Sequence, residues 1–264
     1  MNHRQRIASG IVTTLSAAAL TLGTTSVALA SDAPSKTEST AAAVEKATGT
    51  GDIAPTPASG TRIPQRSTGD AKTVTATGDA VSIALPSSNN VIGTRAGKNT
   101  TVYPGAAKGT DLAIQPTADG GIRALAVLKN ATAPREQRYD IGLPDGAHLV
   151  KLNTGAVAAV AKNGKFLGGF TAPWAKDATG KSIPTSFRID GNTLIQSVQT
   201  TDSTAFPVVA DPKWVNDAAK GTAMGLVSGC VGGAVAGGGA GCIPGAVAGG
   251  LGGAVAGVVG GLFD

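Results

Sequence analysis

Residues 156–170 read AVAAVAKNGKFLGGF and contain the strongest structural signal of the chain. Two mostly apolar runs, 156–161 and 165–170, flank the dipeptide Asn163-Gly164. Asn-Gly between two apolar runs favours a tight turn that joins two antiparallel strands. The stretch therefore predicts a β-hairpin, and it decides the fold class of its surroundings as β-rich.

The same pattern continues on both sides of this hairpin. Turn dipeptides such as Asp145-Gly146 and Asp190-Gly191 separate short apolar runs, and no helix of ten or more residues is expected among them. About ten short strands in one region predict an antiparallel sandwich or barrel, which we place at residues 73–212. Besides the hairpin, the expected strands are 80–85, 100–103, 112–115, 122–128, 139–143, 148–152, 187–189, 194–198 and 205–209.

Two further segments precede this body. Residues 1–30 resemble a secretory signal peptide: Arg4 and Arg6 precede an apolar core at 11–22, and Ala28-Leu29-Ala30 is a small-x-small cleavage site. An uncleaved anchor is the alternative. Residues 31–72 contain few large apolar side chains and are expected to form a disordered linker or a propeptide, because they bury too little surface to offset chain entropy. The expected location is therefore outside the cell, with envelope or membrane association as a further option.

The tail, residues 213–264, is organised by glycine. From Gly221 to Gly261 glycine recurs at every fourth position without exception, and no charged residue occurs between Lys220 and Asp264. On a helix this spacing forms a stripe without side chains, which lets two helix backbones approach closely. The sequence therefore predicts a glycine-zipper helix whose packing residues are Gly221, Gly225, Gly229, Gly233, Gly245, Gly249, Gly253, Gly257 and Gly261, with Gly237 and Gly241 between the two groups.

The two cysteines, Cys230 and Cys242, suggest how the tail folds back. Twelve residues of straight helix would separate them by roughly 18 Å, whereas a disulfide needs Cα atoms within about 7 Å. Export to an oxidising compartment favours a disulfide between them, so the chain is expected to turn near 237–239 and restart at Pro244. Asn216 is the expected N-cap of the first arm. A flexible tail and a strand-forming tail remain as alternatives.

Two short sequence motifs resemble those of a known module. Residues 172–177 read APWAKD, and residues 206–212 read FPVVADP. Together they resemble an uncharacterised secreted module of actinobacteria, in which a closing phrase of this kind leads to a tryptophan, here Trp214, and a glycine-rich tail. Phe206 stands where that module is expected to have tyrosine. The resemblance covers about residues 100–264 and implies export and this order of parts, and the tail is similar to bacteriocin-like glycine-zipper helices.

Catalytic chemistry is hard to assemble from these residues. After cleavage of the leader one histidine remains, His148, in a strand-like run. Most of the candidate aspartates, such as Asp140, Asp177 and Asp190, are expected to be turn residues, and no Gly-x-Ser-x-Gly elbow marks a nucleophile. Trp174 and Trp214 are expected to pack in the fold or to lie at a domain junction more readily than to bind a ligand or a membrane interface. We therefore expect no enzyme activity, cofactor, metal or small-molecule substrate.

The partners follow from the same features. Charged residues make up 15% of the chain and aromatic residues 3%, without a basic cluster that includes aromatics, so nucleic-acid binding is not expected. The first hypothesis is a non-enzymatic secreted protein whose tail enters a lipid bilayer or associates with itself as a homo-oligomer. The alternative is a soluble extracellular structural or interaction module. An exported hydrolase, the third, needs a cleft with convergent ionisable groups.

Overall fold

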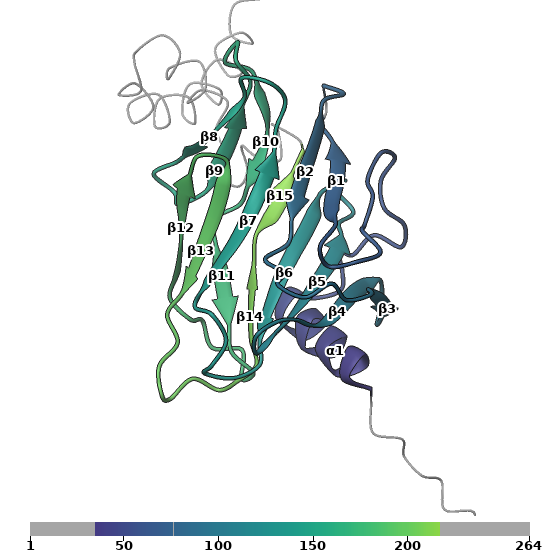
Figure 1. Ribbon diagram of the computed structural model, residues 1–264, viewed down its shortest axis with the longest axis vertical. Coiled ribbons are helices and arrows are strands. Elements are labelled where there is room, and N and C mark those ends of the chain that lie inside the picture. Colours follow the sequence, from purple (N-terminus) through teal and green to yellow (C-terminus); the bar gives the residue numbers. More distant parts are fainter. Residues whose placement is uncertain (1–34, 76, 217–264) are drawn as a thin grey trace, which may run out of the picture. The chain divides into compact units, whose positions relative to one another are not determined.

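The computed structural model describes residues 35–75 and 77–216. These residues form one helix and fifteen strands, and all the strand pairs are antiparallel (Figure 1). The elements are α1 (Lys36–Thr48), β1 (Asp70–Val74), β2 (Ala80–Ala84), β3 (Thr94–Ala96), β4 (Thr100–Ala107), β5 (Thr110–Pro116), β6 (Ile122–Leu128), β7 (Glu136–Gly142), β8 (His148–Lys151), β9 (Val157–Val160), β10 (Phe166–Phe170), β11 (Trp174–Lys176), β12 (Thr185–Asp190), β13 (Thr193–Val198), β14 (Val208–Asp211) and β15 (Lys213–Val215).

The hairpin predicted at residues 156–170 is confirmed. Strands β9 and β10 pair from Phe166 opposite Val160 to Phe170 opposite Val157, with a register shift between Phe166 and Gly168. Gly164 has a φ of 83°, and Lys165 donates its backbone N–H to the side chain of Asn163 at 3.1 Å. The other predicted runs also fall on strands, so the prediction of a β-rich antiparallel body is confirmed.

The strands form two open sheets. One has five strands in the order β1-β2-β7-β13-β12, and the other has the path β3-β4-β5-β6-β15-β10-β9-β8, with β14 joined to β6 and β11 joined to β14. Strand β7 alternates between exposed and buried side chains along its whole length. This alternation is expected for a sheet with one face on a core and one face in solvent.

One apolar core lies between the sheets. Ile83, Tyr139 and Leu194 from the five-stranded sheet pack in the same cluster as Leu112, Phe170 and other residues of the larger sheet. Strands β5 and β6 are instead buried on both faces, because a second apolar cluster covers their other side. This second cluster contains Ala41 and Val44 of α1 together with Val102, Leu125 and Val127.

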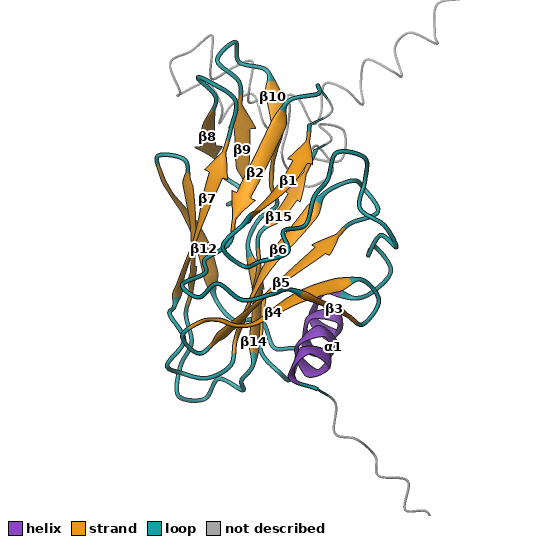
Figure 2. Ribbon diagram, turned by 45° about the vertical axis from the view of Figure 1, so that its right-hand side comes forward, coloured by secondary structure: helices purple, strands orange, loops and turns teal. Residues whose placement is uncertain are grey.

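Helix α1 corrects the prediction for residues 31–72. Instead of a disordered linker, residues 35–72 contain a helix that packs beside β3 and β4 (Figure 2) and an ordered segment that pairs Ile53 with Thr117. The helix buries only Thr40, Ala41 and Val44, so it has no stripe of large apolar residues. Small side chains suffice here because they let the helix lie close to the sheet.

The second boundary of the body also differs from the prediction. We expected the tail to begin at residue 213, but Lys213–Val215 forms β15, which pairs with β6 and β10. Strands β14 and β15 run beside β6 one after the other and are separated only by Pro212, whose carbonyl accepts a hydrogen bond from Ala124 at 3.0 Å. The predicted helical hairpin and its disulfide lie outside the described residues.

Candidate functional site

The junction between the body and the tail is built from the last strand. Trp214 is fully buried in the main core, where its ring meets Phe170 edge to face with 5.1 Å between centroids. Its indole N–H donates to the side-chain oxygen of Asn216 at 2.5 Å. The Asn216 amide in turn donates to the carbonyl of Gly120 at 2.8 Å and to the hydroxyl of Thr73 at 3.2 Å. The described chain therefore ends at a residue that is hydrogen-bonded to Trp214 of the preceding strand and to two other segments, around Thr73 and Gly120.

Charged side chains reinforce the same junction. Lys213 of β15 lies 2.9 Å from the carboxylate of Asp119 and 3.4 Å from that of Asp52, which also pairs with Arg123. Burial by itself raises the pKa of the Asp52 carboxyl, but Arg123 and Lys213 outweigh burial and hold it below its usual value. The cluster thus ties the segment after α1 to strands β6 and β15.

A fully buried carboxyl group lies on the neighbouring strand. Asp211 is 1% exposed, and neither of its side-chain oxygens accepts a hydrogen bond from the described residues. Burial raises the pKa of Asp211 to about 7, against the opposing charge of Arg123. The nearby Tyr139 hydroxyl is also buried without a partner, and burial together with Asp211 raises its pKa. This arrangement favours the neutral form of the carboxyl group.

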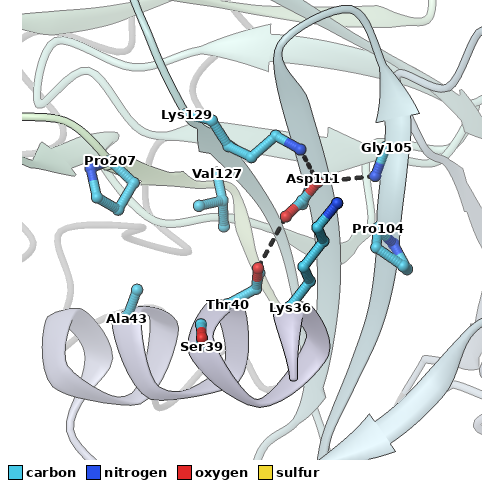
Figure 3. A pocket seen from close by; sticks show the side chains of 10 residues that line it. All are labelled: Lys36, Ser39, Thr40, Ala43, Pro104, Gly105, Asp111, Val127, Lys129 and Pro207. Atoms are coloured by element: carbon cyan, nitrogen blue, oxygen red, sulfur yellow. Dashed lines mark hydrogen bonds and ion pairs between the residues drawn. The ribbon is translucent and has the colours of Figure 1, made fainter. Parts of the chain in front are cut away.

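A hollow of about 510 Å³, called the α1 hollow below, lies between α1 and the outer face of the larger sheet (Figure 3). Helix α1 contributes Lys36, Ser39, Thr40 and Ala43, four residues that the helical period of 3.6 brings to one side. The opposite wall comes from β4, β5, β6 and the chain before β14, and includes Asp111, Val127, Lys129 and Pro207.

Asp111 forms the polar floor of the α1 hollow. Its side chain is nearly buried and accepts hydrogen bonds from the hydroxyl of Thr40 at 2.7 Å and from the backbone N–H of Gly105 at 2.7 Å. The ammonium group of Lys129 lies 2.8 Å from the same carboxylate. Asp111 is therefore satisfied by groups of the protein itself, and it links α1 to the sheet.

A second, smaller hollow of about 260 Å³ lies further along α1, toward its C-terminal end, and shares Ala43 and Pro207 with the first. Two lysines form hydrogen bonds across this hollow, one from the helix to the sheet side and one from the sheet side to the helix. Lys46 of α1 donates to the carbonyl of Ala178 at 2.8 Å, and Lys176 of β11 donates to the carbonyl of Ala47 at 2.9 Å. These hydrogen bonds hold the C-terminal half of the helix on the sheet.

The site residues predicted from the sequence divide into two groups. The cysteines Cys230 and Cys242, the zipper glycines from Gly221 to Gly261 and the cleavage residues Ala28 and Ala30 lie outside the described residues. The expected N-cap role of Asn216 concerns the chain from 217 on and also lies outside them. Trp174 and Trp214 are described, and both pack: Trp174 is partly buried beside the α1 cluster, with Lys176 at 5.4 Å from its ring.

The ionisable residues considered for catalysis lie in separate places. His148 is exposed at the start of β8, and Asp190 pairs with Arg138 at 3.2 Å on the exposed face of the smaller sheet. Asp177 accepts hydrogen bonds from Thr179 and Lys181 in a turn, and the Thr179 hydroxyl lowers its pKa. Within residues 35–75 and 77–216, no three acidic, histidine or cysteine side chains are grouped as metal ligands would be.

The part of the chain that the structure describes contains no helix that is long and apolar enough to cross a membrane.

Helix α1 was not predicted from the sequence, and the α1 hollow was therefore not predicted either. The available signals were the Ser35-x-x-Glu38 cap, in which the Ser35 hydroxyl accepts from the Glu38 N–H at 3.2 Å, and Gly49 just beyond the helix. The chain matches no protein-family model, no curated protein and no solved structure.

Proposed function

We propose that this chain is an exported, non-enzymatic protein whose body carries the glycine-rich tail to a lipid bilayer or to another copy of itself. The observation that carries the proposal is the tail junction. Trp214 is buried in the core, and Asn216 is hydrogen-bonded to the segments around Thr73 and Gly120. A tail that leaves from such a fixed point is held at the body, so that binding by the tail places the whole body at its target.

The pattern of the tail supports this role. The stretch from 221 to 263 has no charge and keeps glycine in one helical stripe. In water each glycine in a helix costs about 0.8–1 kcal/mol relative to alanine, so such a helix needs lipid or a close partner. In the proposed form the arms meet in an α-helical hairpin, stapled by Cys230 and Cys242, and the tail acts as a bacteriocin-like element or as an envelope anchor.

Flotation with lipid vesicles tests the proposal. The protein that begins at residue 31 is expected to float with vesicles or to sediment as an oligomer without them, whereas the chain shortened after Asn216 does neither. Leucine at Gly225, Gly229 and Gly233 should weaken self-association, because it fills the stripe. Leucine at Ala223, Val227 and Val231 is the matched control, since these positions keep the same spacing outside the stripe. Equal behaviour of both variants would remove the zipper role.

The alternative is a soluble extracellular interaction module, and the α1 hollow is the observation that favours it. In that case the body binds its own ligand, and the full chain neither floats nor self-associates. A tail that fails in flotation while the hollow binds a ligand would support this second function.

A further inference from the structure

We propose that the α1 hollow is a binding site for a small amphiphile with an anionic head and an apolar chain, of the long-chain carboxylate class. The inference concerns the body alone and goes beyond the proposed role of the tail. The volume of the α1 hollow, about 510 Å³, falls within the range of about 300–1,000 Å³ that is typical of small-molecule sites.

The charges in the α1 hollow select an anion. Lys36 and Lys129 both direct their ammonium groups toward the end of the hollow where Asp111 lies (Figure 3). Asp111 is already matched, because Lys129 pairs with it and the Thr40 hydroxyl and Gly105 N–H donate to it. Lys36 forms no ion pair with any described residue. The hollow therefore has one positive charge in excess, next to a carboxylate that needs no further donor.

The position of Lys36 strengthens this argument. It is the first residue of α1, a helix of 13 residues with Ser35 as its N-cap. The first turn of a helix carries partial positive charge, so a lysine there is unfavourable unless an anion lies nearby. Lys36 is thus placed where the helix N-terminus and its own charge favour a negative group. Lys129 is matched by Asp111, and Glu38 of the same turn is exposed and does not line the hollow. The exposed hydroxyl of Ser39, one turn along the same wall, adds a hydrogen-bond donor.

The rest of the hollow is apolar. Ala43 and Pro207 form the end away from Lys36, and Val127 lies between Pro207 and Asp111. Such a surface favours a hydrocarbon chain over a polar ligand, because burial of each methylene strengthens binding by about threefold to fourfold. An amphiphile would therefore bind with its head beside Lys36 and its chain along the helix toward Ala43. A small anion such as acetate has no hydrocarbon chain and would leave the apolar part of the hollow unfilled.

Isothermal titration of the full mature chain with dodecanoate, below its micellar concentration, tests the inference. We expect saturable binding at one site per chain, weaker binding of octanoate, and at least tenfold weaker binding of dodecanol and of dodecyltrimethylammonium. Equal affinity for the cationic amphiphile would overturn the inference, as would binding of acetate as tightly as dodecanoate or no binding of dodecanoate at all.

Variants locate the binding in the α1 hollow rather than in the tail. Lys36→Glu reverses the unmatched charge and should weaken dodecanoate binding at least tenfold, whereas Lys165→Glu, an equal change of charge in the turn between β9 and β10, should leave it unchanged. Ala43→Trp fills the apolar end and should abolish binding, and circular dichroism checks that this variant is folded. Unchanged affinity in Lys36→Glu would place the binding elsewhere. The leucine variants of the tail should still bind dodecanoate, which keeps this result separate from the fate of the proposed tail function.

Discussion

Trp174 lies directly opposite Asp211 in the antiparallel ladder that joins β11 to β14. The segments 172–177 and 206–212 therefore contain strands that lie side by side, although about thirty residues separate them in the chain. Asp211 is fully buried at this contact, while Trp174 is partly covered by the cluster beneath α1. The pairing joins a buried carboxyl group to the surface that supports the helix.

Asp211→Asn should change how stability depends on pH. The folded protein holds the Asp211 proton with a pKa of about 7, whereas the unfolded chain releases it near 3.8. The protonated Asp211 carboxyl group therefore makes a contribution to stability that is fully present below pH 4. This contribution is lost as the pH rises through about 7. Asparagine keeps the shape without the charge, so the variant should melt at a higher temperature than the parent at pH 8 and should show a smaller difference at pH 4.

Melting curves by circular dichroism at these two pH values measure this effect. Asp190→Asn is the matched control, because Asp190 is exposed and paired only with Arg138 at the surface. Its melting temperature should follow that of the parent at both pH values. A parent protein whose stability relative to Asp211→Asn does not change between pH 4 and pH 8 would contradict the assignment of a buried neutral carboxyl group.

Gly168→Ala should destabilise the junction that holds the tail. Gly168 has a φ of 148°, and an added Cβ would collide with the indole ring of Trp214 and the carbonyl of Val215. Overpacking of this kind typically costs about 1–3 kcal/mol. Urea unfolding measures the loss. Gly51→Ala, where an added Cβ meets no atom and φ is not positive, should be neutral, and equal midpoints for the two variants would disprove the close packing.

Thr40→Val should loosen α1 while leaving its shape intact. The Thr40 hydroxyl donates to the buried carboxylate of Asp111 at 2.7 Å. Loss of a hydrogen bond to a charged group costs about 1.5–3 kcal/mol, and valine fills the same volume. Ser39→Val, at the exposed residue just before Thr40, should lower the free energy of unfolding by less than about 0.5 kcal/mol. Urea unfolding compares the two, and limited proteolysis between residues 49 and 52 reports on release of the helix.

Cys230→Ser should leave export intact and expose the tail to proteases, because the proposed disulfide with Cys242 would be absent. A loop of this length is expected to contribute about 3 kcal/mol by constraining the unfolded chain. The parent protein treated with a reductant should show the same increase in cleavage. Equal protease resistance in the parent, the variant and the reduced parent would exclude the disulfide as a staple.

The sequence was most informative where turns and apolar runs coincide. The Asn163-Gly164 signal located β9 and β10, because Gly164 takes the positive φ of 83° that the turn requires and apolar runs flank it on both sides. The short strands β1, β3, β11 and β15 were missed, since three to five residues carry too little pattern and are defined by their partners. Helix α1 was missed for a different reason: its buried face consists of Thr40, Ala41 and Val44, which resembles a polar linker unless the sheet surface beneath it is known.

The candidate sites could be predicted only in part. Trp214 was expected to have a packing or domain-junction role, and it is buried in the main core against Phe170. The α1 hollow could not be foreseen, because Lys36, Asp111 and Lys129 are far apart in sequence and meet only through the pairing of β5 with β6 and the placement of α1. The raised pKa of Asp211 likewise depends on burial that the local sequence does not reveal.

The central claim is that the tail forms helices when it meets lipid or a second copy. Circular dichroism of the oxidised peptide 217–264, first in buffer and then with lipid vesicles, tests it most directly. A helical spectrum that appears or strengthens with vesicles, or with rising peptide concentration, is the predicted result. A coil spectrum under both conditions and at all concentrations would contradict the claim, and would leave the body and its α1 hollow as the functional part of the chain.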